Sequence, residues 1–468
     1  MKLWMVIPLF SALAGCAVGP DYREPRQQVP AQFSNVTQPG LGEGEVIAQF
    51  WKLLNDPQLD QLVQDALAAN KDLARAAASL RASRAAARLA GFDLYPTVTA
   101  GASYSRTLES SQQVPFVPAN TLEPTNTYEV GFDAAWELDF FGRVRRSNQA
   151  ARAAAGAAEA TLRDATVTVT AEVARNYCVL RGLQDQLAVA ERNAVNQRQT
   201  LDLTQARLDA GRGTELDVSR ADAQLATTEA TIPPLRTSIA TTIHRLSVLT
   251  GRQPAVLVPE LSAPRPVPAL PALNAVGGPE NLLRRRPDIR IAERNLAAAT
   301  AQIGVDVADL FPRVTLVGSA GYIAGSWNDL GSAASQAYSV GPSITWAAFD
   351  LGRVRARIHI ARAEADVALA TYEAAVLNAL EDTENSLVNY GDAQGRESTL
   401  ERASTQSTRA ARLARQRFEG GLSDFLSVLQ AERDALAAED GLAQARTQTA
   451  TALIAVYKAV GGGWMLPP

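Results

Sequence analysis

The chain contains few of the residues from which disulfide frameworks or metal clusters are built. Its 468 residues include two cysteines, Cys16 and Cys178, and two histidines, His244 and His359. Two cysteines cannot form a disulfide framework, and a structural zinc site of the Cys/His type needs four such ligands at close spacing. No Ser/His/Asp set, Cys/His set or pair of carboxylates stands out. We therefore expect no metal, no cofactor and no enzymatic activity.

The sequence also lacks an excess of positive charge. Lysine and arginine number 45 against 49 aspartates and glutamates, which gives a net charge of −4. Nucleic-acid binding usually requires a basic face, so we expect no nucleic-acid partner. Both signs are nevertheless plentiful, as is typical of long solvated helices.

Proline is absent from two long stretches, residues 143–232 and 343–466. Both are rich in Ala, Arg, Leu, Gln and Glu, which are strong helix formers. Within the first stretch apolar or small residues recur every seven positions, the pattern of a coiled-coil seam: Leu180, Leu187, Ala194, Leu201 and Leu208. A helix over residues 142–211 would be on the order of 100 Å long. Glycines at its end predict a tight turn into an antiparallel return helix, which Pro233 and Pro234 should kink.

Alternating segments precede the two helical stretches. From Tyr128 to Leu138 apolar residues occupy one face and small or acidic residues the other, and residues 97–105 alternate in the same way. This period of two predicts strands with one apolar and one hydrophilic face. Hairpins of such strands are typical of transmembrane barrels, although the signal is weak for any single strand.

The chain is internally duplicated. Residues 309–315 match residues 93–99 at an offset of 216, and the stretch from Trp346 matches the stretch from Trp136 at an offset of 210. The helical turn at residues 417–421 repeats the turn at 207–211, also at 210. Matching landmarks in the same order indicate two structural repeats.

The first residues are typical of a secretory signal. Lys2 is followed by an apolar core at residues 3–13, which is too short to span a bilayer as a mature helix. Residues 13–16, Leu-Ala-Gly-Cys, resemble the bacterial lipobox, whose cysteine becomes the lipidated first residue of the mature protein. We expect Cys16 to carry diacylglycerol and an N-acyl chain such as palmitate, which anchors the chain to a membrane surface. Ala17, which is not Asp, is consistent with the outer membrane.

These signals predict six segments. They are a signal peptide (1–15), a lipid-anchored extended segment (16–55), a first repeat (56–251), a proline-rich surface linker (252–279), a second repeat (280–460) and a C-terminal tail (461–468). The first repeat would hold a helix from Asp56 to about Ala90, a β-hairpin (97–138) and a helical hairpin (142–251). The second would hold a helix, a β-hairpin (313–347) and a helical hairpin (352–460).

Four membrane strands leave two open edges, which hydrocarbon cannot satisfy. The smallest membrane barrels have about eight strands, so the chain must associate with further copies. A dimer, trimer or tetramer would supply 8, 12 or 16 strands, and only the larger barrels enclose an aqueous lumen.

The chain resembles the TolC-like outer-membrane factors, and among them the OprM/NodT efflux lipoproteins. The resemblance covers essentially the whole chain and rests on residues 16–22, 282–290, 308–312, 457–458 and 461–464. It implies a mixed α/β membrane protein: a homotrimer with a 12-strand barrel continued by a periplasmic α-helical barrel. It also implies an outer-membrane exit duct for small toxic compounds or drugs. The partners would be a periplasmic adaptor protein and an inner-membrane efflux transporter.

The resemblance places a periplasmic gate at the helical turns, at Asp217, Leu426, Gln430 and Arg433. Relatives usually carry aspartates where this chain has Ser427 and Gln430, which argues against a cation-selective ring. Asp424 and Glu432 are nearby alternatives. The other interpretation is that these are ordinary solvated residues of a helical turn. Arg207, Gly211, Arg417 and Gly421 are candidates for adaptor docking, and the glycines could also act simply as helix C-caps.

Other classes of protein remain open on sequence grounds. A lipid-anchored coiled-coil spacer would explain the heptads but not the amphipathic hairpins. A periplasmic adaptor would carry lipoyl-like β segments in their place. The outer-membrane duct of a type I protein secretion system is a further alternative, since the sequence does not reveal the cargo.

Overall fold

The computed structural model describes residues 17–34, 49–110, 123–271, 277–462 and 464. The chain forms two compact units. The first comprises Met1–Arg26, Ser79–Glu159 and Ile291–Glu373, and the second comprises Gln27–Ala78, Ala160–Arg290 and Ala374–Pro468. The helices α4 (Arg143–Asp209) and α10 (Leu351–Glu419) contribute residues to both.

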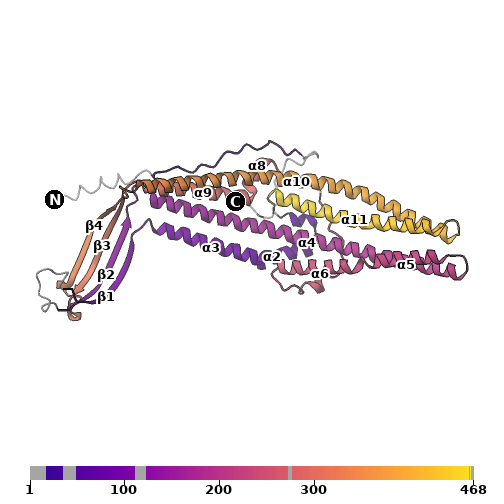
Figure 1. Ribbon diagram of the computed structural model, residues 1–468, viewed down its shortest axis with the longest axis horizontal. Helices are drawn as coiled ribbons and strands as arrows, with labels where there is room; N and C mark the ends of the chain where they lie inside the picture. The colour runs from indigo at the N-terminus through magenta and orange to yellow at the C-terminus, as the bar shows by residue number, and fades with distance from the viewer. Residues whose placement is uncertain (1–16, 35–48, 111–122, 272–276, 463, 465–468) are drawn as a thin grey trace. The chain divides into compact units, whose positions relative to one another are not determined.

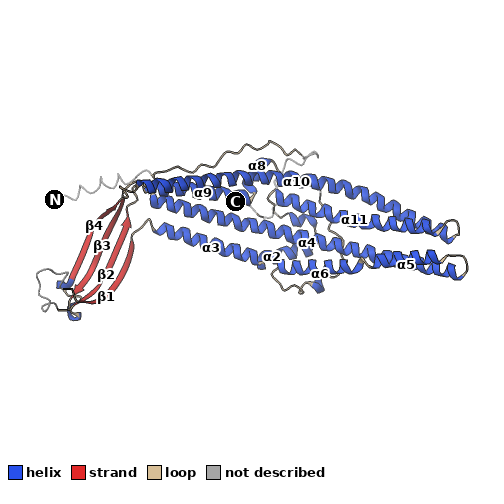
Figure 2. Ribbon diagram, viewed as in Figure 1, coloured by secondary structure: helices blue, strands red, loops and turns tan. Residues whose placement is uncertain are grey.

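The first unit contains a four-stranded antiparallel sheet in the order β1-β2-β3-β4 (Figures 1 and 2). The strands are β1 (Thr97–Thr107), β2 (Thr125–Glu137), β3 (Arg313–Ala324) and β4 (Gln336–Thr345). Each hairpin comes from one repeat, and β2 pairs with β3 to join the two hairpins. The predicted strands are confirmed, and the sheet shows in addition that the hairpins are neighbours within one chain.

The two faces of the sheet differ as the alternation predicts. Residues paired across strands share a face, so the register gives the composition of each face. On the apolar face the rings of Tyr104 and Tyr128 lie 4.8 Å apart. On the opposite face the hydroxyls of Ser319 and Ser339 are hydrogen bonded at 2.9 Å. Threonine, serine, glycine and acidic residues dominate this second face, which therefore suits water.

The two hairpins have the same register once the sequence offsets are applied. Thr97 pairs with Ala135 in the first hairpin, and Arg313 pairs with Thr345 in the second. Adding 216 to residue 97 and 210 to residue 135 converts the first pair into the second. The duplication seen in the sequence is thus a duplication of backbone pairing.

Two long helices and their return helices dominate the rest of the fold (Figure 2). The first repeat contains α2 (Pro57–Ala69), α3 (Lys71–Phe92), α4, α5 (Glu215–Glu229) and α6 (Ile232–Leu249). The connection holds α7 (Val258–Leu261), and the second repeat contains α8 (Pro279–Arg285), α9 (Pro287–Ala308), α10 and α11 (Phe425–Ala459). In Figure 1, α5 returns beside the end of α4, and α11 returns beside the end of α10.

The helix predicted from Asp56 to about Ala90 is in fact two helices. α2 ends at Ala69 and α3 begins at Lys71, because Asn70 adopts an extended ψ of 135°. The Asn70 Oδ1 accepts hydrogen bonds from the amides of Asp72 and Leu73, which caps the start of α3. Its Nδ2 donates to the carbonyl of Leu249 at 2.8 Å. This tertiary partner fixes the break.

The proline-rich connection is less exposed than the sequence suggests. Leu257 and Leu261 are 1% and 0% exposed, and the Gln184 Nε2 donates to the carbonyl of Leu261 at 2.8 Å. The expectation of a surface linker is therefore wrong for this part, because its leucines pack into the core of the second unit. Residues 272–276 lie outside the described residues.

The core of the second unit gathers apolar side chains from both repeats. The rings of Phe50 and Tyr457 are stacked with their centroids 5.2 Å apart, and Cys178 is fully buried. Burial raises the pKa of the Cys178 thiol to about 12. The thiol is thus a packed core group in the middle of α4.

Among the described residues, no helix has the length together with the hydropathy that a membrane span requires.

Candidate gate at the helical turns

The turns that end α4 and α10 have the same geometry. Gly211 and Gly421 both have a φ of 71°, a left-handed conformation that glycine adopts at little cost. The amide of Gly211 donates to the Leu208 carbonyl at 2.8 Å, and the amide of Gly421 donates to the Phe418 carbonyl at 2.9 Å. Both glycines therefore terminate their helices as C-caps.

Each return helix begins at a side-chain cap. In α5 the Thr214 hydroxyl accepts from the Asp217 amide at 3.2 Å and donates to the Asp217 carboxylate at 2.8 Å. In α11 the Asp424 carboxylate accepts from the amide and the hydroxyl of Ser427, and these bonds lower the Asp424 pKa. Asp217 thus lies in the first turn of α5 and Asp424 at the N-cap of α11, and negative charge is favourable at both positions.

An apolar cluster next to the turns joins the two repeats. It contains Phe418, Phe425, Val428 and Leu429 of the second repeat and Ala221 of the first. The rings of Phe418 and Phe425 are 5.7 Å apart.

Two arginines cross between the repeats around this cluster. The Arg207 guanidinium lies 4.3 Å from the centroid of the Phe418 ring and donates to the Phe418 carbonyl at 2.7 Å. The Arg433 Nε donates to the Gln224 Oε1 at 2.5 Å, and Gln224 is 7% exposed. Each arginine therefore binds one helical hairpin to the other within the chain.

Three of the four predicted gate residues share one face of α11. Leu426, Gln430 and Arg433 are spaced at i, i+4 and i+7, so they form a stripe, and all three are exposed. Asp217 does not join this stripe, since it belongs to the start of α5. Arg417 is exposed, whereas its counterpart Arg207 is half-buried against Phe418.

Sequence reasoning missed part of this arrangement. The Thr200 hydroxyl of α4 donates to the Glu432 carboxylate of α11 at 2.8 Å, and burial raises the Glu432 pKa. Heptad patterns do not indicate which polar side chains meet across helices. Phe418 could have been found from the duplication, because it stands 210 residues after Leu208 and is the bulkier of the two.

The predicted lipidation site, Cys16, lies outside the described residues, but the residues that follow it are held in place. The Val18 amide donates to the Phe141 carbonyl at 3.0 Å, and the buried Arg146 donates to the carbonyls of Val18 and Gly19. Arg146 also pairs with Asp21 at 2.8 Å. The segment after Cys16 is thus attached where the chain leaves β2 and enters α4.

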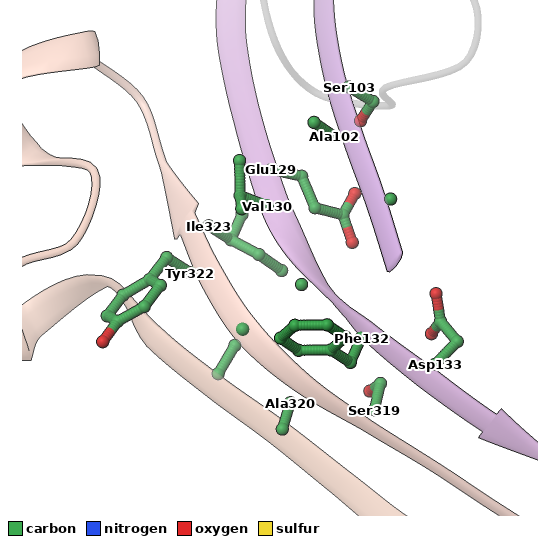
Figure 3. Close-up of a pocket in the computed structure, with 14 residues that line it drawn as sticks. Ala102, Ser103, Glu129, Val130, Phe132, Asp133, Ser319, Ala320, Tyr322 and Ile323 are labelled. Carbon is green, nitrogen blue, oxygen red and sulfur yellow. The ribbon is translucent and has the colours of Figure 1, made fainter. Parts of the chain in front are cut away.

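The polar face of the sheet is hollowed around two carboxylates. In Figure 3, Glu129 and Asp133 extend from one side of β2, and Ser103 and Ser319 come from the neighbouring strands. Ser103 pairs with Glu129, and Ser319 pairs with Asp133, so the four side chains share this face. The part of the chain that the structure describes holds no cluster of three His, Cys, Asp or Glu residues able to bind a metal ion.

Comparison with known proteins agrees with this architecture. Residues 62–252 and 278–462 match the model of the outer membrane efflux protein family. Nodulation protein T of Rhizobium leguminosarum bv. trifolii is 33% identical over 98% of this chain and 97% of its own length. The toluene efflux pump outer membrane protein TtgI of Pseudomonas putida is 30% identical over 98% of each chain.

Solved structures have the same fold. The outer-membrane channel OprN is 44% identical, with a TM-score of 0.91 over 96% of this chain and 100% of that channel. The open state of the MtrE outer membrane channel of Neisseria gonorrhoeae is 28% identical, with a TM-score of 0.83 over 96% of this chain and 98% of its own. The predicted TolC-like fold is therefore confirmed. The chain belongs to the outer membrane efflux protein family and is an outer-membrane exit duct.

Proposed function

We propose that this duct works as a homotrimer in a tripartite efflux pump that exports small toxic compounds or drugs. The observation that carries the proposal is the sheet: β1 and β4 are its outer strands, and four strands cannot close a barrel. Three chains would supply twelve strands around the face that carries Glu129 and Asp133. Long helical hairpins ending in glycine turns then provide a periplasmic surface for an adaptor, which links the duct to an inner-membrane transporter.

The cargo class is supported by relatives. SrpC and TtgI are named for solvent and toluene efflux, and OpmQ for pyoverdine export. Deleting the gene should sensitise the cell to exported toxic compounds, and unchanged susceptibility across a broad panel would count against the proposal. Heat-modifiable migration on a gel distinguishes a closed barrel from a coiled-coil spacer, which shows no such shift.

The gate is proposed at Asp217, Leu426, Gln430 and Arg433. Support comes from the exposed stripe on α11 and from the contact between Arg433 and Gln224, which holds the hairpins together. Replacing both Asp217 and Arg433 with alanine should raise single-channel conductance in planar bilayers. An unchanged conductance would remove these two residues from the gate.

Adaptor docking is proposed at the two glycine turns. An added Cβ at Gly211 or Gly421 would meet nothing within 4 Å, so their backbone is open to a partner. Arg207 stabilises the turns by donating to the Phe418 carbonyl and lying against the Phe418 ring. Arg417 occupies the matching position in the second repeat. Bulky substitutions at both glycines should abolish adaptor co-purification while the duct still reaches the outer membrane.

The anchor is proposed at Cys16, supported by the lipobox-like sequence and by the attachment of residues 18–21 beside the sheet. Cells grown with labelled palmitate should label the wild-type chain and not the Cys16→Ser variant. Equal labelling of both would place the lipid elsewhere.

A further inference from the structure

A cavity of about 260 Å³ lies among four segments of the second unit, apart from the candidate gate and from the hollow in the sheet. At roughly 30 Å³ for each water molecule, it has room for about eight of them. Its charged side chains come from α4, from the break between α8 and α9, from α10 and from α11: Asp164, Arg286, Asp288, Asp382 and Lys458. Charges of both signs therefore meet in one cavity.

Three of these five charges are already matched to one another. The Arg286 guanidinium donates to the carboxylates of Asp288 at 2.7 Å and Asp382 at 3.0 Å. It also donates to the carbonyl of Ala459, near the end of α11, at 3.1 Å. The Arg286 side chain is only 11% exposed. This group is a finished network that forms one wall of the cavity.

The other two charges have no such partner. Within the described residues, neither the Asp164 carboxylate nor the Lys458 ammonium makes a hydrogen bond or an ion pair. Lys458 is exposed, whereas Asp164 is half-buried. Burial raises the Asp164 pKa and the charge of Asp288 adds to the shift, while Lys458 and Arg286 oppose it. A half-buried carboxylate without a partner destabilises the folded chain.

We propose that this cavity binds the zwitterionic centre of an α-amino acid. The ligand's ammonium donates to the Asp164 carboxylate, and the ligand's carboxylate accepts from the Lys458 ammonium. Both contacts are charge-assisted hydrogen bonds, the stronger kind, and each satisfies a charge that the chain leaves unmatched. This binding goes beyond the proposed export function and depends neither on the cargo nor on the gate.

The balance of charge favours a zwitterion over a simple ion. A free anion would face three carboxylates and two cations, and an amine without a carboxylate would leave Lys458 unmatched. Among the described residues there is no group of three His, Cys, Asp or Glu able to hold a metal ion, so the carboxylates of the cavity are not placed to bind a divalent cation. A zwitterion adds no net charge and supplies a partner for each unmatched group.

This ligand chemistry has two sources. One is a free amino acid, and the other is a peptide that carries a free amino-acid centre on a side chain, as the diamino acid of cell-wall peptides does. The cavity has room for the amino-acid centre alone, so the remainder of a peptide would extend into solvent. The two sources are separated by the probes used.

The first test is a titration of the detergent-solubilised full chain, followed by saturation-transfer NMR, which detects weak binding. The probes are L-alanine and meso-diaminopimelate, with N-acetyl-L-alanine and L-alaninamide as controls that each lack one of the two charges. The zwitterions should bind, and each control should bind about 10–100-fold more weakly. Absence of binding by both zwitterions, or equal binding of all four probes, would overturn the proposal.

Two variants assign the contacts. Asp164→Asn should weaken L-alanine about 10–100-fold and leave N-acetyl-L-alanine unchanged, because that probe has no ammonium to lose. Lys458→Gln should weaken L-alanine similarly and leave L-alaninamide unchanged. The matched control is Asp202→Asn, an exposed aspartate of α4 outside the cavity, which should bind like wild type. Undiminished binding of L-alanine by Asp164→Asn would place the ligand elsewhere.

Thermal denaturation without ligand separates lost binding from lost folding. Because the ionised Asp164 carboxylate is disfavoured in the folded chain, Asp164→Asn should unfold at a higher temperature than wild type at pH 7. Weaker binding by a more stable variant identifies a ligand-binding carboxylate. A lower unfolding temperature together with lost binding would show that Asp164 stabilises the fold, and the proposal would fall.

The last comparison identifies the source. A cell-wall muropeptide with a free diamino-acid centre is titrated against the same muropeptide with that centre N-acetylated. Binding of the first and not of the second assigns the site to cell-wall peptides, and binding of L-alanine with neither muropeptide assigns it to free amino acids. Equal binding of both muropeptides would contradict recognition of the zwitterion. Heat-modifiable migration of Asp164→Asn should match wild type, so failure of this inference leaves the proposed duct standing.

Discussion

The Thr200 hydroxyl in α4 donates a 2.8 Å hydrogen bond to the Glu432 carboxylate in α11 and so ties a helix of the first repeat to one of the second. Burial raises the Glu432 pKa, because the ionised carboxylate loses solvation between the helices. The bond from Thr200 and the nearby Arg415 oppose the shift without cancelling it.

The raised Glu432 pKa predicts that protonation of this carboxylate stabilises the folded state, so that the free energy of unfolding depends on pH. The folded state binds the proton more tightly than the unfolded state, so the stabilisation is complete below the ordinary glutamate pKa of about 4.3 and is lost as the pH rises through the raised value. Glu432→Gln should therefore slow amide exchange in the first half of α11 at pH 7 relative to wild type. The difference should vanish near pH 4, once rates are corrected for intrinsic exchange. Faster exchange in the variant at pH 7 would contradict the prediction.

The Arg433–Gln224 hydrogen bond should stabilise the fold more than the exposure of Arg433 suggests. Removing Arg433 leaves the buried Gln224 carbonyl oxygen without its donor, at a cost of about 1–3 kcal/mol. A double-mutant cycle of Arg433→Ala and Gln224→Ala, read by amide exchange at the turns, should give a coupling of about 0.5–3 kcal/mol. Gln430→Ala is the matched control, because Gln430 lies on the same stripe and is exposed. Strict additivity would show that the two side chains do not interact.

Gly182→Ala should destabilise the second unit. An added Cβ would lie 2.8 Å from the Thr447 Cβ and closer still to its hydroxyl, so α4 and α11 would have to move apart. Overpacking of this kind costs about 1–3 kcal/mol. The control is Gly395→Ala in α10, where nothing lies within 4 Å and alanine should stabilise the helix by up to about 1 kcal/mol. Thermal denaturation in detergent should give a lower unfolding midpoint than wild type for Gly182→Ala and not for Gly395→Ala.

Arg181 should be essential to the second unit. Its side chain is 0% exposed, donates to Gln58, Gln184 and the Ala263 carbonyl, and lies 4.7 Å from the centroid of the Tyr177 ring. Truncation to alanine removes these bonds and leaves the buried Gln184 amide oxygen without its donor, so we expect a loss of about 1–3 kcal/mol.

The matched control for this prediction is Arg175→Ala, an exposed arginine in the same helix, which should change stability by less than about 0.5 kcal/mol. Both variants are compared by chemical denaturation of the detergent-solubilised chain. Equal stability of the two would show that the network around Arg181 contributes nothing.

Much of the candidate gate region follows from short-range rules that the sequence displays. The turns at Gly211 and Gly421 were predictable, because only glycine adopts the left-handed C-cap cheaply and both positions recur at the same offset. The stripe of Leu426, Gln430 and Arg433 was predictable from its i, i+4, i+7 spacing. By contrast, the partners Gln224 and Phe418 lie on other helices, and periodicity along one helix does not say which side chain of another will meet it.

The amino-acid sequence by itself determined the alternating strands, the long proline-free helices and the duplication, because each depends on local periodicity and on residue types that repeat. Tertiary structure decided the rest. The hydrogen bond from Asn70 to the Leu249 carbonyl separates α2 from α3. The leucines of the proline-rich connection are buried in the core. Tertiary structure also set β2 against β3. Those outcomes depend on contacts between residues far apart in the chain, whose energies become available only when the whole core is assembled.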